Sequence, residues 1–214
     1  MTRHLSCLCT VLTLAACAAG NAGGNDVVAV PTNAVPEIRA VATNMASWLK
    51  KGTGREFKVQ TGSWTGTGVW LAVVGETGGV QCSGVRPDSG ATNLAGRGPE
   101  SVWIRADTNG VCIAGKTPLA VRHGMYIYLE QLGYRWFFPN EVWRIIPEVE
   151  SVFVPFAYCG EPAFKNRRIW YAYGTSSKQC DDDYKRWIEC NRQGGAFEPM
   201  FGHAWPGIVN LNKG

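Results

Sequence analysis

The sequence has few histidines and lacks the paired cysteine motif that is typical of zinc sites. It contains 3 His, and none of its 8 Cys residues forms a C-x-x-C pair. Structural zinc sites are built from such ligands, so zinc is not expected. A complete phosphate-binding loop is also missing, since Gly115-Lys116-Thr117 matches only its end. We therefore expect no metal and no other cofactor.

Strong charge and long apolar runs are missing as well. Charged residues make up 18% of the chain, and the formal net charge is +4. The basic residues are scattered, and so mild a charge does not favour a nucleic-acid partner. The apolar run over residues 5–16 is shorter than the roughly 20 residues that a membrane-spanning helix needs.

Residues 1–24 have the features of an export signal. Arg3 is followed by the apolar run and then by small residues. Leu14-Ala15-Ala16-Cys17 is similar to the lipobox of bacterial lipoproteins, which would make Cys17 a lipidation site. Ordinary cleavage after Ala16-Cys17-Ala18 is the alternative. We expect an exported protein, either secreted or in the bacterial cell envelope, whose membrane contact is limited to a lipid anchor on Cys17.

Glycine and tryptophan are abundant. The chain has 26 Gly and 9 Trp among 214 residues, and 45% of its residues are hydrophobic, which is enough for a buried core. Glycine-rich loops with many tryptophans suit a carbohydrate-active protein, because aromatic faces stack on sugar rings. The alternative is that these tryptophans fill the core.

The hydrophobic spacing predicts two amphipathic helices. Thr32 or Asn33 is expected to cap the first helix, which ends at Gly52. The second is expected to begin at Thr117-Pro118 and to end before Gly133, because these residue types suit an N-cap, a first turn and a left-handed terminus.

Strand signals surround these two helices. Apolar or alternating segments occupy residues 26–31, 57–59, 69–74, 101–106 and 111–114, and Asn109-Gly110 predicts a hairpin between the last two. The aromatic segment 134–138 is expected to join the same sheet, followed by short strands at 142–147 and 151–155. The order predicts an α/β fold of the α+β type, a small mixed β-sheet with two helices packed on one face.

Two segments carry a resemblance to a known family. Residues 124–139 read GMYIYLEQLGYRWFFP, and residues 161–168 read EPAFKNRR. The first resembles the end of the N-terminal domain of bacterial α-glucuronidase-like glycoside hydrolases, a domain that also precedes the barrel of β-hexosaminidases. The second is similar to the start of the catalytic barrel in those families.

The resemblance implies a domain organisation. Residues 25–155 would form the N-terminal domain, and residues 156–214 the start of an incomplete (β/α)8 barrel. A strand at 168–173 and a helix at 181–192 would be its first elements. A complete barrel needs about 200 residues or more, so only its beginning is expected here.

The same resemblance implies a substrate-binding arginine. Arg167 matches the arginine that reaches sugar hydroxyls in hexosaminidase-like proteins, and Arg168 leaves the register open by one residue. A guanidinium group suits adjacent hydroxyls or a uronate carboxylate. The alternative is an ion pair with a nearby acid. His203, in Gly202-His203-Ala204-Trp205, is a second candidate for substrate contact, with a solvated loop histidine as the alternative, whereas His123 is interpreted as structural.

No catalytic residues can be assigned, because glycoside hydrolysis normally requires two carboxyl groups that face each other. The acids at 181–183 are interpreted as a helix cap, with a metal site as the alternative. Glu189 lies within the predicted helix, and Glu198 lies in a loop with no visible partner. We therefore expect a non-catalytic accessory domain of a secreted, polysaccharide-degrading glycoside hydrolase, which binds a glycan containing uronic acid or hexosamine. The alternatives are a carbohydrate-binding surface lipoprotein and a structural domain that docks on a partner barrel.

Overall fold

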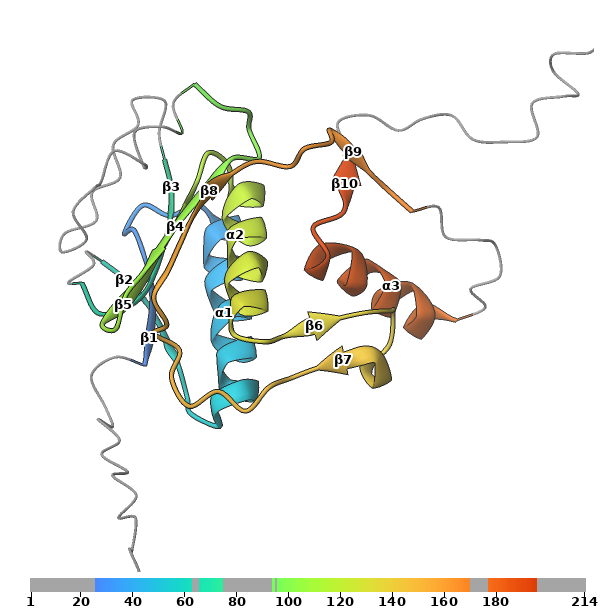
Figure 1. Cartoon of the computed structure of the whole chain (residues 1–214), viewed down its shortest axis with the longest axis horizontal. Helices are drawn as coiled ribbons and strands as arrows, with labels where there is room; N and C mark the ends of the chain where they lie inside the picture. Colours follow the sequence, from blue (N-terminus) through green and yellow to red (C-terminus); the bar gives the residue numbers. More distant parts are fainter. Residues whose placement is uncertain (1–25, 63–65, 75–93, 95, 170–176, 196–214) are drawn as a thin grey trace, which may run out of the picture.

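A six-stranded mixed sheet with helices against one face forms the centre of the molecule (Figure 1). The computed structural model describes residues 26–62, 66–74, 94, 96–169 and 177–195. The strand order is β2-β1-β3-β5-β4-β8. The strands are β1 (Val27–Val30), β2 (Lys58–Thr61), β3 (Gly68–Val73), β4 (Val102–Ala106), β5 (Gly110–Gly115) and β8 (Phe156–Gly160). Strands β2, β1, β3 and β5 pair in parallel, whereas β4 runs antiparallel to both β5 and β8.

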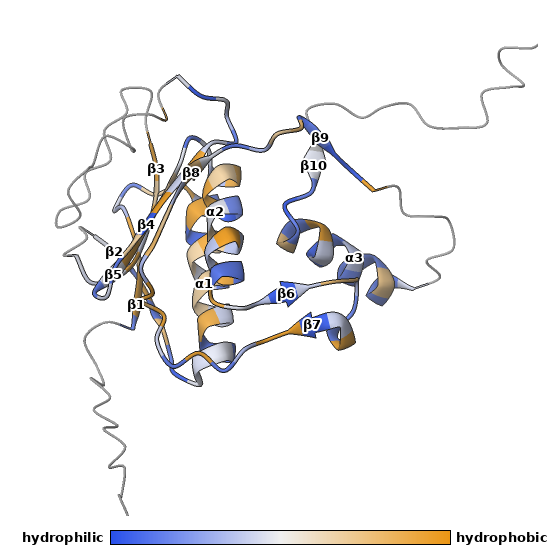
Figure 2. Cartoon of the chain, in the orientation of Figure 1, coloured by the Kyte–Doolittle hydropathy of each residue, from blue (hydrophilic) through white to orange (hydrophobic). Residues whose placement is uncertain are grey.

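Helices α1 (Pro36–Thr53) and α2 (Pro118–Gln131) pack on one face of this sheet (Figure 1). Their inward residues and one face of the strands form a single buried cluster that includes Ile38, Leu49, Ile104 and Leu129. In Figure 2 the hydrophobic colour follows the strands and the packed helix sides. The predicted fold class, a mixed sheet with two helices on one face, is confirmed.

The second face of the sheet carries another apolar cluster, and here the tryptophans fill the core. Trp70 and Trp103 lie in it, 5% and 4% exposed, together with small residues such as Ala72 and Ala114. Trp48 and Trp136 are buried on the helix side. For these four tryptophans the core-filling alternative is correct.

Helix α1 begins later than the sequence pattern suggested. Val35 is its N-cap and makes no side-chain capping bond, so the prediction of a cap at Thr32 or Asn33 is wrong. Pro36 explains the start, because proline suits the first helical position and keeps the preceding residue extended. The helix ends at Gly54, which has a φ of 72° and donates to the Lys50 carbonyl.

Helix α2 begins as predicted. The Thr117 hydroxyl accepts a hydrogen bond from the Ala120 N–H at 3.2 Å, and Pro118 occupies the first turn. Gly133, with a φ of 102°, follows the helix end as expected. The predicted hairpin also forms, because the Asp107 carboxylate accepts from the backbone N–H groups of Asn109 and Gly110 at 2.7 and 3.0 Å.

The aromatic segment after α2 does not join the main sheet, contrary to the prediction. It forms β6 (Arg135–Trp136), which among the described residues pairs only with β7 (Arg144–Ile145); the 3₁₀ helix η2 (Glu141–Trp143) precedes β7. This hairpin lies beyond the helices, away from the sheet (Figure 1). The Trp136 ring packs edge-on against Trp48 of α1 and Tyr126 of α2. Tyr134 and Trp136 of this segment therefore cover the outer side of the helix pair, whereas Phe137 and Phe138 are exposed.

The C-terminal part of the described chain packs next to this hairpin. Helix α3 (Lys178–Cys190) begins three residues earlier than predicted, because the Ser177 hydroxyl caps it by accepting a hydrogen bond from the Cys180 N–H. The acids at 181–183 are therefore not the cap. Strand β9 (Asn166–Arg167) pairs antiparallel with β10 (Gly194–Gly195). Neighbouring strands of a (β/α)8 barrel are parallel. Most of the predicted strand 168–173 lies outside the described residues, so the barrel start stays a prediction.

The main sheet extends past the expected domain boundary at residue 155, since β8 is its edge strand.

The helices within the described residues are all too short or too polar to cross a membrane.

Candidate functional site

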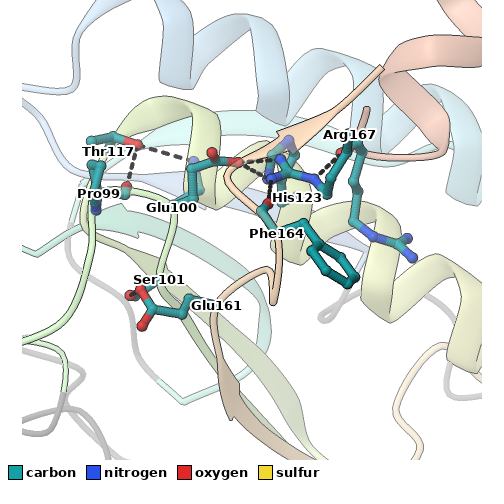
Figure 3. A network of polar contacts seen from close by, with 10 residues as sticks. Pro99, Glu100, Ser101, Thr117, His123, Glu161, Phe164 and Arg167 are labelled. Atoms are coloured by element: carbon teal, nitrogen blue, oxygen red, sulfur yellow. Dashed lines mark hydrogen bonds and ion pairs between the residues drawn. The ribbon is translucent and has the colours of Figure 1, made fainter. Parts of the chain in front are cut away.

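A pocket of about 220 Å³ lies between helix α2, the turn before β4 and the segment that runs from β8 to β9. Its wall includes Glu100, His123, Glu161, Phe164, Arg167 and Arg192. Figure 3 shows Glu100, His123 and Arg167 pointing toward one another. These side chains come from parts of the chain that are far apart in sequence.

Arg167 is the most firmly held side chain of the pocket. Its Nε donates to the Arg192 carbonyl at 3.1 Å, its Nη1 to the Phe164 carbonyl at 2.6 Å, and its Nη2 to Glu100 Oε2 at 2.5 Å (Figure 3). The Arg167 side chain is 19% exposed. The adjacent Arg168 is exposed and does not line the pocket. The structure thus places Arg167 in the site, and the ion pair that was weighed as its alternative role is present as well.

Glu100 is positioned by the start of helix α2. The Thr117 hydroxyl donates to the Pro99 carbonyl at 2.8 Å, and the Lys116 N–H donates to the Ser101 carbonyl at 3.1 Å. On the other side of the turn, Gly98 N–H and Ser101 Oγ donate to Glu161 Oε2 at 2.9 and 3.0 Å. These bonds hold the residues on both sides of Glu100, so its carboxylate faces Arg167.

His123 forms the buried wall of the pocket. It is 3% exposed, and its Nδ1 lies 3.4 Å from Glu100 Oε2 without forming a hydrogen bond. Burial, followed by the positive charges of Arg167, Arg122 and Arg192, lowers the pKa of His123 from 6.5 to about 4. The imidazole is therefore neutral at neutral pH and adds no positive charge beside Glu100.

Two ion pairs attach the C-terminal elements to α2 near this pocket. Arg122 of α2 pairs with Glu189 of α3 at 3.3 Å, and Arg192 pairs with Glu130 of α2 at 2.8 Å. Trp187 and Asn191 also donate to the Trp136 carbonyl at 3.2 and 3.0 Å. The Arg192 carbonyl that binds Arg167 is thus held in place by the docking of α3.

The site residues predicted from the sequence do not all lie in this pocket. Arg167 lies in the pocket and Arg168 outside it, whereas His203 and the lipidation candidate Cys17 lie outside the described residues. Among the described residues, no group of three or more His, Cys, Asp or Glu side chains is arranged to hold a metal ion.

Sequence reasoning missed several residues of this pocket. Glu161 and Phe164 belong to the segment that carried the resemblance, so that segment contained a signal for them. Glu100 and His123 gave none, because their partner Arg167 is 67 and 44 positions away.

Comparison with models of known protein families gave no match, and a search of curated proteins found no similar sequence. The resemblance to glycoside hydrolases therefore depends on the two quoted segments. The side chains that line the pocket include two carboxylates, two guanidinium groups, a neutral imidazole and a phenyl ring, together with the Tyr158 phenol and the Asn191 amide.

Proposed function

We propose that this chain is the non-catalytic N-terminal accessory domain of a secreted, α-glucuronidase-like glycoside hydrolase, and that the pocket at Arg167 binds one sugar unit of a polysaccharide. One observation carries this proposal. Arg167 is fixed by two backbone carbonyls and one carboxylate inside a pocket, so its guanidinium group is oriented before any ligand arrives. A preoriented group loses little conformational entropy when it binds.

The chemistry of the wall supports a sugar ligand. A guanidinium group has five N–H donors, and three of those of Arg167 are used by described partners, which leaves two for hydroxyl oxygens. Phe164 lines the same pocket and is 73% exposed, so its ring is available to stack on the apolar face of a sugar. The pocket is smaller than the roughly 300–1,000 Å³ that is typical for drug-sized ligands, which favours a single ring.

The carboxylates of the pocket support a binding role over a catalytic one. Glu100 accepts a hydrogen bond from Arg167, and Glu161 accepts from Gly98 and Ser101. A general acid must instead donate a proton to the leaving oxygen of the glycosidic bond. We therefore expect the chain alone to bind sugar without cleaving glycosides.

The proposal includes an exported protein that contacts the membrane only through a lipid on Cys17, as the lipobox-like segment predicts. A lipid anchor there would hold the sugar-binding domain outside the cytoplasm, where polysaccharide is present.

Titration of monosaccharides, followed by protein NMR, tests the proposal. We expect dissociation constants in the millimolar range, typical of few contacts, and loss of binding in Arg167→Lys, which keeps the charge but lacks the planar fork. The neighbouring variant Arg168→Lys is the matched control and should bind as the original chain does. Equal sugar binding by Arg167→Lys would contradict the site, and turnover of aryl glycosides that Glu161→Gln abolishes would contradict the accessory role.

A further inference from the structure

We infer that Glu100 determines the specificity of the Arg167 pocket, so that it selects a neutral sugar ring with adjacent hydroxyls over a uronate. This inference deepens the proposed function and depends on it, because it specifies which of the two expected ligand chemistries the pocket accepts. It follows from the arrangement of donors and acceptors, and separately from the charges of the wall.

The donors and acceptors of the pocket match two neighbouring hydroxyl groups. Both contacts of the Glu100 carboxylate fall on Oε2, and Oε1 has no hydrogen-bond partner in the described part of the chain. Beside it, Arg167 keeps two N–H groups that no described residue uses. One sugar hydroxyl can accept from Arg167 while the next donates to Glu100 Oε1. A uronate whose carboxylate faces Arg167 offers only acceptors there and leaves Glu100 Oε1 without a donor.

The charges of the wall point the same way. Glu100 and Glu161 balance Arg167 and Arg192, and Arg192 is also paired with Glu130. His123 is neutral at neutral pH, with its pKa lowered to about 4 by burial and by the neighbouring arginines. The pocket thus has no positive charge in excess for an anionic ligand. A uronate bound to Arg167 would stand next to the Glu100 carboxylate, and the two like charges would repel each other.

Three ligands of nearly the same shape test this inference on the full chain: glucose, glucuronate and glucuronamide, the neutral amide of glucuronate. We expect the original chain to bind glucose and glucuronamide about tenfold more tightly than glucuronate. Glu100→Gln should bring the glucuronate and glucuronamide affinities to within about twofold of each other. Glu141→Gln is the matched control, because it makes the same change in the Arg144–Glu141 pair, which lies outside the pocket wall.

The comparison of glucuronate with its amide needs no variant, so the test works even where Glu100→Gln does not fold. Equal affinity of the original chain for these two ligands would overturn the inference and leave sugar binding intact. The same holds if a folded Glu100→Gln keeps the tenfold preference, or if Glu141→Gln abolishes it as well. If none of the three ligands binds, the proposed function fails together with the inference.

Discussion

The packing of Gly52 against Tyr134 offers a quantitative test of the fold. Gly52 lies within helix α1, and a Cβ atom placed there would stand 2.1 Å from Tyr134 Oη and 3.1 Å from the Pro147 carbonyl oxygen. The Tyr134 ring cannot move away easily, because it is fully buried and its hydroxyl donates to the Trp48 carbonyl at 2.7 Å. Gly52→Ala should therefore destabilise the protein, although alanine is the better helix former.

The expected free-energy changes can be worked out from these contacts. Overpacking a rigid site lowers the free energy of unfolding by about 1–3 kcal/mol. The better helix propensity of alanine offsets at most about 1 kcal/mol of this loss. We expect a net loss of about 1–2 kcal/mol for Gly52→Ala. Tyr134→Phe removes one hydrogen bond and should cost about 1 kcal/mol. Since the phenylalanine lacks the clashing oxygen, the double variant should be more stable than the sum of the two single changes predicts. The difference should be at least about 0.5 kcal/mol, the lower end of the roughly 0.5–3 kcal/mol that is typical of coupled residues.

Urea unfolding of the four proteins of this cycle measures the coupling. Gly54→Ala serves as the control, because Gly54 has a φ of +72° and no atom within 4 Å of an added Cβ. Gly54→Ala should lower the free energy of unfolding by about 1–2 kcal/mol, because alanine is strained in the left-handed conformation. This loss should add to that of Tyr134→Phe without coupling. Additive changes for Gly52→Ala and Tyr134→Phe, within about 0.5 kcal/mol, would refute this account of the contact.

Two further predictions concern His123 and Cys17. The pKa of His123 is lowered from 6.5 to about 4 in the folded protein, so the unfolded chain takes up the proton first as the pH falls. The free energy of unfolding should therefore fall by up to about 3 kcal/mol between pH 6.5 and 4. Urea unfolding across this range should show the loss in the original chain and a smaller one in His123→Gln; equal losses would contradict the assignment. Cys17→Ser should move the protein from the membrane to the soluble fraction of bacterial envelopes and remove labelling by fatty acid, whereas unchanged labelling would exclude Cys17 as the anchor.

Features that depend on residues close together in the chain were predictable from the sequence. The start of α2 at Thr117-Pro118 and the turn at Asn109-Gly110 each involve bonds that span no more than three residues. Gly133 adopts the left-handed conformation for which glycine pays no steric penalty. The fold class followed from the spacing of hydrophobic residues, because helix and strand periods determine which faces must be buried.

Features that depend on distant partners were decided by the tertiary structure. The segment 134–138 has the residues of a sheet strand, yet Tyr134 and Trp136 pack on α1 and α2, and that burial outweighs the local preference. The sequence matched Arg167 to the family's arginine but left the register open by one residue, to Arg168. Only the β9–β10 pairing and the docking of α3 direct the first into the pocket.

The sequence by itself therefore determined the main elements, the layered fold and the segment in which the candidate arginine lies. The tertiary structure alone decided that Glu100, His123 and Arg167 meet in one pocket (Figure 3). The reason is physical: helix caps and hairpin turns are stabilised within a few residues. The Glu100–Arg167 pair joins groups 67 positions apart, so it depends on how distant elements pack against one another.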